Sequence, residues 1–214
     1  MRLDNPNMAL TVIELLEKIH LDAKIALHFT NPLELLIATI LSAQCTDERV
    51  NIVTKTLFKK YRSAEDYAWA DLKELEQDIR STGFYRNKAK NIKDCCQLLV
   101  AKFNSQVPQT MDELLELPGV ARKTANVVLQ NAFNIVKGII VDTHVQRVSQ
   151  RLGMTTERDA RKVEKDLMNV IPKRYWKRFA DLLIFHGRRI CSAKKPKCHI
   201  CVLNKICPSA FTFD

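Results

Sequence analysis

Four cysteines near the C-terminus have the spacing of a metal centre. They lie within 17 residues in the pattern C-x6-C-x2-C-x5-C: Cys191, Cys198, Cys201 and Cys207. Four thiolates so close, in a chain without a secretory signal, indicate either tetrahedral zinc or an iron–sulfur cluster. The single CxxC pair, where a zinc ribbon has two, weighs against zinc without excluding it. The loop between the first two cysteines carries Lys194 and Lys195, and we expect this loop to contact phosphate because both its ends are held.

Residues 110–133 predict a second feature, two short helices joined by a tight turn. Thr110 and Glu113 form a capping box that opens the first helix, and Pro118 ends it. Gly119 is free to take positive φ and to bring its backbone close to another molecule. The turn therefore directs amide groups and the N-terminus of the second helix at one place, an arrangement that binds phosphate.

Three polar residues are candidates for chemistry. Lys123 falls in the first turn of the second hairpin helix, where we expect burial and the helix dipole to lower its pKa and make it a nucleophile. The alternative is a surface lysine, the commonest fate of a lysine. Asp142 is expected to cap a helix beginning near Thr143, and an ionised capping carboxylate also stabilises a transient cation. Gln44 ends an apolar helical stripe, where a polar residue is more often a cap or solvated than functional.

The composition fits an anionic partner. The 214 residues include 34 Lys and Arg against 24 Asp and Glu, which gives a net charge of +10, and such a charge attracts nucleic acid. Seven cysteines, an odd number, do not form a secreted disulfide framework. There is no signal peptide, and no apolar run approaches the ~20 residues of a membrane span. We expect a cytoplasmic monomer, associated with the nucleoid if the source is prokaryotic.

Capping patterns predict helices along almost the whole chain. The expected starts are Thr11 with Glu14, Asn31 with Pro32, Ser63 with Asp66, Asp71 with Glu74, Thr156 with Asp159, and Pro172. Gly83 is expected to end the helix that opens at Asp71, and residues 84–87 to form a loop before a helix that runs to about Phe103. The β-branched cluster in residues 135–141 is too short for a paired strand, and we interpret it as a buried connector. The sequence predicts an all-α protein.

Four segments together resemble one known family. The chain is similar to endonuclease III, the DNA glycosylase/AP lyase of the helix-hairpin-helix superfamily, over essentially its whole length. The matching segments are LSAQCTDERVN at 41–51, LPGVARKTANVVL at 117–129, VDTHVQRV at 141–148, and FHGRRIC with the three later cysteines. The resemblance implies a six-helix barrel, residues 24–135, and a [4Fe–4S] cluster domain made from residues 1–23 and 136–214, with a DNA-binding cleft between them.

The resemblance also implies roles for residues at matching positions. Lys123 would attack C1′ of the damaged nucleotide, Asp142 would assist departure of the base, and Gln44 would fill the gap left by the flipped base. The four clustered cysteines would bind the cluster. The implied activity is base excision repair of double-stranded DNA. Oxidised pyrimidines would be removed through a lysine Schiff base, and the strand would be nicked there or at abasic sites by β-elimination.

Two positions depart from the family pattern. Ala121 stands where the hairpin usually has glycine, and its methyl group restricts φ and the approach of the backbone. We expect the amide there to bind phosphate still, in a shifted geometry. Phe84 stands where an aliphatic wedge is common. Its ring could stack on exposed bases, or it could pack on the helix that follows.

Two other functions remain open. An adenine-specific mismatch glycosylase shares the hairpin, the aspartate and the cluster, but it generally lacks the lysine and adds a C-terminal recognition domain. Lys123 and the end of the chain at Asp214 argue against it. A non-catalytic iron–sulfur protein that binds DNA or signals redox state would explain the charge and the cysteines. It would leave Lys123 and Asp142 together unexplained.

Overall fold

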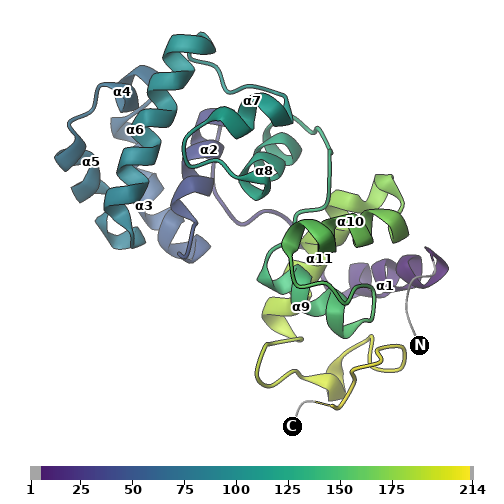
Figure 1. The fold of residues 1–214 in the computed structure, drawn as a ribbon. Coiled ribbons are helices and arrows are strands. Elements are labelled where there is room, and N and C mark those ends of the chain that lie inside the picture. Colours follow the sequence, from purple (N-terminus) through teal and green to yellow (C-terminus); the bar gives the residue numbers. More distant parts are fainter. Residues whose placement is uncertain (1–5, 213–214) are drawn as a thin grey trace. The chain divides into compact units, whose positions relative to one another are not determined.

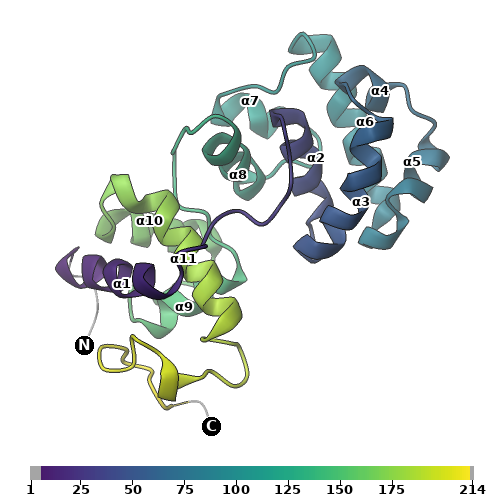
Figure 2. The same ribbon diagram turned by 180° about the vertical axis from the view of Figure 1, so that it is seen from behind.

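The protein is built from helices (Figures 1 and 2). In residues 6–212, the range that the computed structural model describes, there are eleven α-helices and no strand. The prediction of an all-α protein is confirmed. The α-helices are α1 (Pro6–Ile19), α2 (Pro32–Leu41), α3 (Asp47–Lys60), α4 (Ala64–Ala68), α5 (Leu72–Asp78), α6 (Tyr85–Lys102), α7 (Met111–Glu116), α8 (Arg122–Ala132), α9 (Thr143–Arg151), α10 (Ala160–Val170) and α11 (Trp176–Arg189). Three 3-10 helices accompany them: η1 (Arg80–Thr82), η2 (Lys173–Tyr175) and η3 (Cys198–Ile200).

The chain folds as two units. The terminal unit combines Met1–Ile25 with Gly138–Asp214, and the central unit is Ala26–Lys137. The chain passes from one unit to the other after Ile25 and again after Lys137, each time two residues later than the limits that the resemblance implies. Residues 1–5 and 213–214 of the predicted cluster domain lie outside the described range. No helix in that range is long and apolar enough to cross a membrane.

In the central unit, α2 is enclosed by other helices. It packs against α3, α6 and α8, while α4 and α5 pack along α6 (Figures 1 and 2). Every residue from 35 to 41 of α2 is buried, as expected of a helix that is apolar all round. The predicted hairpin forms from α7 and α8, which contact one another. The unit therefore holds the hairpin against a fixed core.

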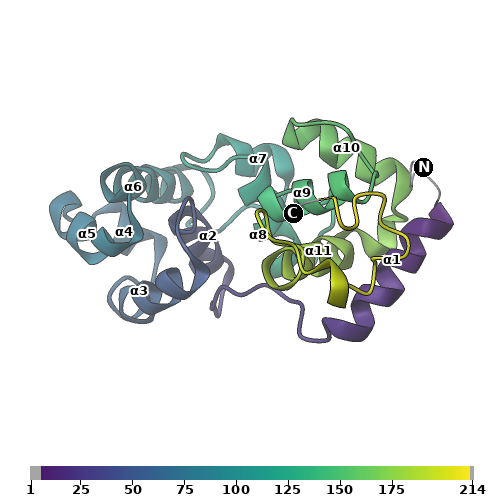
Figure 3. The same cartoon turned by 90° about the horizontal axis from the view of Figure 1, so that it is seen from below.

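In the terminal unit, α11 packs against α9 and α1. Figure 3 shows the C-terminal segment, drawn in yellow, on the same unit as α9 and α11. Two arginines of α11 fix the N-terminal segment: Arg189 forms a bidentate pair with Asp22, with N–O distances of 2.8 and 2.6 Å, and Arg178 Nη1 donates to Ala23 O at 2.8 Å. These contacts join residues more than 150 positions apart in the sequence.

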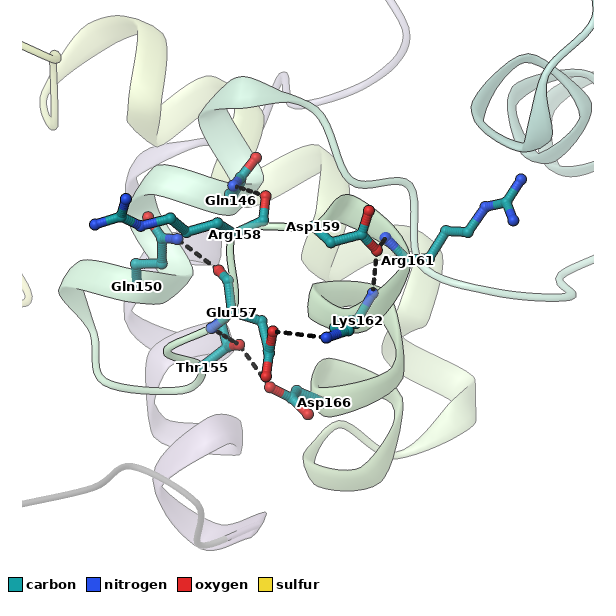
Figure 4. A network of polar contacts seen from close by, with 9 residues as sticks. All are labelled: Gln146, Gln150, Thr155, Glu157, Arg158, Asp159, Arg161, Lys162 and Asp166. Atoms are coloured by element: carbon teal, nitrogen blue, oxygen red, sulfur yellow. Dashed lines mark hydrogen bonds and ion pairs between the residues drawn. The ribbon is translucent and has the colours of Figure 1, made fainter.

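The segment between α9 and α10 is fixed by two glutamines of α9 (Figure 4). Gln146 Nε2 donates to Arg158 O at 2.6 Å, and Gln150 Nε2 donates to Glu157 O at 2.6 Å. These bonds satisfy loop carbonyls that have no partner within a helix. They hold the segment on α9 before α10 begins.

The capping predictions succeed at several helix starts and fail at Thr11 and Thr156. Asn31, Ser63 and Asp71 each cap a helix as expected. The prediction for Thr11 was wrong, because α1 already begins at Pro6 and the Thr11 hydroxyl donates within the helix to Asn7 O at 3.0 Å.

Three helix limits also differ from those predicted. Asp159, not Thr156, is the N-cap of α10, because its Oδ1 accepts from the amides of the second and third helical residues. The expected loop at 84–87 is wrong, since α6 begins at Tyr85. Pro172 precedes η2, and α11 begins only at Trp176. Residues 135–141 form no strand, and Ile139–Val141 are buried, as expected of the connector.

Candidate active site

The hairpin turn depends on glycine at position 119. Gly119 has φ +77°, as predicted, in the left-handed region that side chains rarely adopt. A Cβ built there would lie 2.9 Å from the Asn91 Cβ of α6. The turn is therefore packed directly on α6 while the backbone of Gly119 stays exposed. A larger residue would both strain the turn and displace it.

Ala121 causes no strain in the turn. Its φ is −95° and its ψ is 171°, an extended conformation that any residue adopts. The expected restriction on φ therefore has no cost at this position. Ala121 is also the N-cap of α8 and provides no side-chain cap. The Ala121 side chain thus leaves the N-terminus of α8 open to an external phosphate.

Lys123 is the second residue of α8, in the first turn as predicted. Its side chain is exposed, so the burial expected from the sequence is not provided by this chain. Lys123 follows the hairpin turn directly and belongs to the same unit as Gln44 and Phe84. A ligand bound at the turn would therefore lie close to Lys123.

Gln44 and Phe84 share an unusual backbone. Both have positive φ, +52° and +48° respectively, which costs about 1 to 3 kcal/mol for a residue other than glycine. Both side chains are exposed, and Phe84 is 65% exposed. This exposure favours a ring that is free to contact a ligand over one that packs on the following helix. Such strain is characteristic of sites where function fixes the backbone.

Asp142 caps α9, as predicted. Its Oδ1 accepts from the amides of His144 and Val145, both at 2.8 Å. Oδ2 takes no part in the cap, and the side chain is half-buried. The carboxylate is thus held in one orientation at the positive end of a helix. It belongs to the terminal unit, whereas Lys123 belongs to the central unit.

The four clustered cysteines line one pocket with residues of α9 and α11. The pocket encloses about 410 Å³, open solvent included, and all four cysteines are half-buried. Within residues 6–212, no group of three or more His, Cys, Asp or Glu side chains is arranged to hold a metal ion. Two nitrogens approach the sulfurs: Arg151 Nη1 lies 3.2 Å from Cys191 Sγ, and His186 Nε2 lies 3.4 Å from Cys201 Sγ. The four thiols are not grouped around one metal position in this structure, but their chemistry, four cysteine sulfurs with N–H donors nearby, is that of an iron–sulfur ligand set.

His186 connects this pocket to the N-terminal segment. Its Nδ1 lies 3.3 Å from His20 Nε2, and both rings are buried. Burial, with a smaller contribution from His20, lowers the pKa of His186 to about 4. A neutral imidazole has one N–H, so donation from Nε2 to Cys201 requires Nδ1 to accept from His20.

Two arginines of α9 fix the loop that begins at Cys191. Arg147 Nε donates to Cys191 O at 3.2 Å, while Arg151 donates to Ser192 O at 2.7 Å and to Ala193 O at 2.8 Å. The lysines that follow in this loop are exposed: Lys194 and Lys195. These arginines were not predicted from the sequence. Their i, i+4 spacing on an amphipathic helix was the available signal.

The chain is similar to known DNA repair proteins. A family model described as "HhH-GPD superfamily base excision DNA repair protein" matches residues 37–173, and one described as "Iron-sulfur binding domain of endonuclease III" matches residues 191–207. Endonuclease III of Synechocystis sp. is 53% identical over 202 residues, which cover 94% of this chain and 92% of that protein. Endonuclease III of Bacillus subtilis is 51% identical over 186 residues, 86% of this chain and 84% of that protein.

Solved structures agree with these matches. A trapped endonuclease III–DNA covalent intermediate superimposes with a TM-score of 0.93 and 49% identity, covering 97% of this chain and 98% of that one. A non-covalent endonuclease III–DNA complex gives the same TM-score and identity over 97% of each chain. A thermostable thymine-DNA glycosylase, at 24% identity and a TM-score of 0.85 over 95% of this chain and 97% of that one, shares the fold.

Proposed function

Because the chain belongs to the endonuclease III family, we propose that Lys123 and Asp142 carry out its chemistry on damaged double-stranded DNA. The protein is a base excision repair enzyme, a DNA glycosylase and AP lyase with a [4Fe–4S] cluster. The observation that supports the assignment is the position of Lys123. Its exposed amine lies in the first turn of α8, directly after the hairpin turn.

Binding begins with phosphate and ends with an extruded nucleotide. The turn around Gly119 and the N-terminus of α8 bind the DNA backbone through amides. The damaged base then leaves the stack, which costs a few kcal/mol and less for a damaged pair. Gln44 and Phe84, exposed and fixed in left-handed conformations, occupy the space that the base vacates.

The glycosylase step makes one bond and breaks one. The lone pair of Lys123 Nζ attacks C1′, and the bond from C1′ to the base nitrogen breaks, with its electron pair leaving on the base. Positive charge develops on the sugar during this step. The Asp142 carboxylate, held by two backbone amides, stabilises that charge. Loss of a proton from the amine and ring opening then give the Schiff base.

The lyase step uses the Schiff base as an electron sink. Water takes a proton from C2′, the released electron pair forms a C2′–C3′ double bond, and the 3′ phosphate departs with the C3′–O electron pair, so the strand is nicked by β-elimination. Water then releases Lys123. The reaction consumes no oxidant and requires no added metal ion.

The cluster domain supplies a second contact to the backbone. Four residues would hold the cluster: Cys191, Cys198, Cys201 and Cys207. When bound, the cluster crosslinks the C-terminal segment. Arg151 fixes the start of the loop that carries Lys194 and Lys195, because it donates to the carbonyls of Ser192 and Ala193. We propose that Lys194 and Lys195, exposed on this fixed loop, contact phosphate as a charged pair.

We propose that the substrates are oxidised pyrimidines and abasic sites and that the enzyme acts as a monomer. The test is borohydride trapping with duplexes that carry an oxidised pyrimidine, 8-oxoguanine, a mismatched adenine or an abasic site. We expect nicking and a covalent complex with the first and last of these, with chelator present. Release of adenine from the mismatch without a trapped complex would contradict the proposal and favour an adenine-specific enzyme.

Replacement of the exposed aromatic ring tests the role proposed for Phe84. We expect Phe84→Ala to lower kcat/KM for nicking a duplex with an oxidised pyrimidine about tenfold, since stacking of an aromatic ring on a base contributes about 1 to 3 kcal/mol. Trp69→Ala is the matched control, because Trp69 is also an exposed aromatic residue of the central unit, 72% exposed. Unchanged turnover in Phe84→Ala would remove the support for a wedge.

A further inference from the structure

Lys88 is a buried lysine that contacts the two segments preceding Gln44 and Phe84. It lies on α6 and is 5% exposed. Its Nζ donates to two backbone carbonyls, Leu41 O and Thr82 O, both at 2.8 Å. Buried lysines are rare because an ammonium group loses its hydration. Burial lowers the pKa of Lys88, so the position has a cost that the two bonds must offset.

Both acceptors are the last residues of helices. Leu41 ends α2 and Thr82 ends η1. The final carbonyls of a helix have no partner within it, and they form the negative end of the helix dipole. A single ammonium group placed between two such ends satisfies both. Lys88 therefore ties the ends of two separate helices to a third.

Each of these helix ends leads directly into a strained residue. Gln44 follows Leu41 by three positions, and Phe84 follows Thr82 by two. Both have the left-handed backbone described above. Conformations of this cost persist only where surrounding contacts fix the chain. Lys88 supplies a fixed point immediately before each of them.

The same face of α6 also supports the hairpin. Asn91 lies one turn beyond Lys88 and is the residue against which Gly119 packs. The segments that carry Gln44, Phe84 and Gly119 are thus all held by contacts to α6, and all belong to the central unit. A shift of one loop relative to the others would require α6 to break a contact.

We propose that Lys88 is a positioning residue, which sets the separation between Gln44 and Phe84 so that both side chains enter the duplex as a pair. This inference rests on the roles proposed above for these two residues. Lys88 itself does not touch the DNA. It acts through the two carbonyls, and its loss lets each loop relax independently.

The test is Lys88→Met, which keeps the apolar stem and removes the charge and the N–H donors. We expect kcat/KM for nicking a damaged duplex to fall about tenfold to a hundredfold, the scale of a misplaced contact group. We also expect a smaller fluorescence rise from 2-aminopurine placed opposite a tetrahydrofuran abasic analogue, because unstacking is incomplete. Lys90→Met is the matched control on the same helix, since Lys90 is exposed and forms an ion pair with Asp94.

A coupling measurement separates positioning from general destabilisation. Lys88→Met is introduced into the wild type and into a Gln44→Ala/Phe84→Ala background, and both readouts are repeated. If Lys88 acts through the pair, its replacement has little further effect in that background. An equal loss in both backgrounds, or no loss in either, would overturn the inference. If Lys88→Met fails to fold, Lys88→Gln, which keeps two N–H donors, takes its place in the same cycle.

The outcome is distinguishable from a failure of the proposed function. Borohydride trapping of the wild type at an abasic site depends on the Lys123 amine. If the wild type forms the trapped complex and the Lys88 variants show no coupling, only the role proposed for Lys88 is wrong. If the wild type forms no trapped complex, the assignment of Lys123 is wrong, whatever the coupling shows.

Discussion

Lys123→Gln should abolish the borohydride-trapped complex with an abasic-site duplex and lower nicking at least about a thousandfold, because removal of a nucleophile leaves only binding and electrostatic contributions. Glutamine keeps a polar side chain of similar length in the first turn of α8, so the hairpin should remain folded. Duplex binding should weaken only modestly, since one charge among the phosphate contacts is lost. The measurement is denaturing gel electrophoresis of labelled duplex after trapping.

The matched control for Lys123→Gln is Lys55→Gln. Lys55 is an exposed lysine of the same unit, on α3, and its replacement makes the same change in charge. It should trap like the wild type. If a trapped complex still forms with Lys123→Gln and is lost when another lysine is replaced, that other lysine is the nucleophile. This outcome would overturn the assignment.

Asp142→Asn should separate the two functions of this residue. The amide oxygen of asparagine can still accept from the amides of His144 and Val145, and asparagine caps helices as well as aspartate. The melting temperature should therefore change little. The negative charge is lost, and we expect release of an oxidised pyrimidine to fall about a hundredfold to a thousandfold, as when one preorganised stabilising group is removed. Single-turnover base release measures this step.

Asp159→Asn is the control for Asp142→Asn. Asp159 caps α10 in the same manner, with Oδ1 accepting from two amides at 3.0 and 3.1 Å. Asp159→Asn makes the same change of charge at a helix cap of the same unit. It should leave base release unaffected. If both variants lose activity equally, or if Asp142→Asn retains full base release, the carboxylate has no specific role in the reaction.

The parts of the fold that sequence predicts well are those with local causes. A cap such as Asn31 binds an amide three residues away, so residue type and spacing suffice. The left-handed turn at Gly119 also follows from local sequence. Thr11 shows the limit of this reasoning, because the same residue type also occurs inside a helix, bonded to the carbonyl four residues before it.

The contacts that sequence did not predict join distant segments. Lys88 binds a carbonyl 47 positions away, and Arg151 binds one 41 positions away. A buried lysine has no periodic signature that distinguishes it from a solvated one. The left-handed backbone of Phe84 was equally hidden, since a bulky residue seldom adopts it. The residues proposed to react were found by motif, whereas those that hold them in place required the tertiary structure.

The division of the chain into a continuous unit and a discontinuous one has a consequence for biosynthesis. The central unit is complete in sequence once residue 137 has left the ribosome, and domains generally fold as units during synthesis. The helix α1 must wait for α11, its packing partner, and for Arg178 and Arg189, which hold the segment after α1. Prior folding of the central unit shortens the flexible chain that must close, which lowers the entropic cost of joining the two ends. The cysteines that line the pocket are synthesised after the whole central unit, so the hairpin that carries Lys123 can fold before this pocket is assembled.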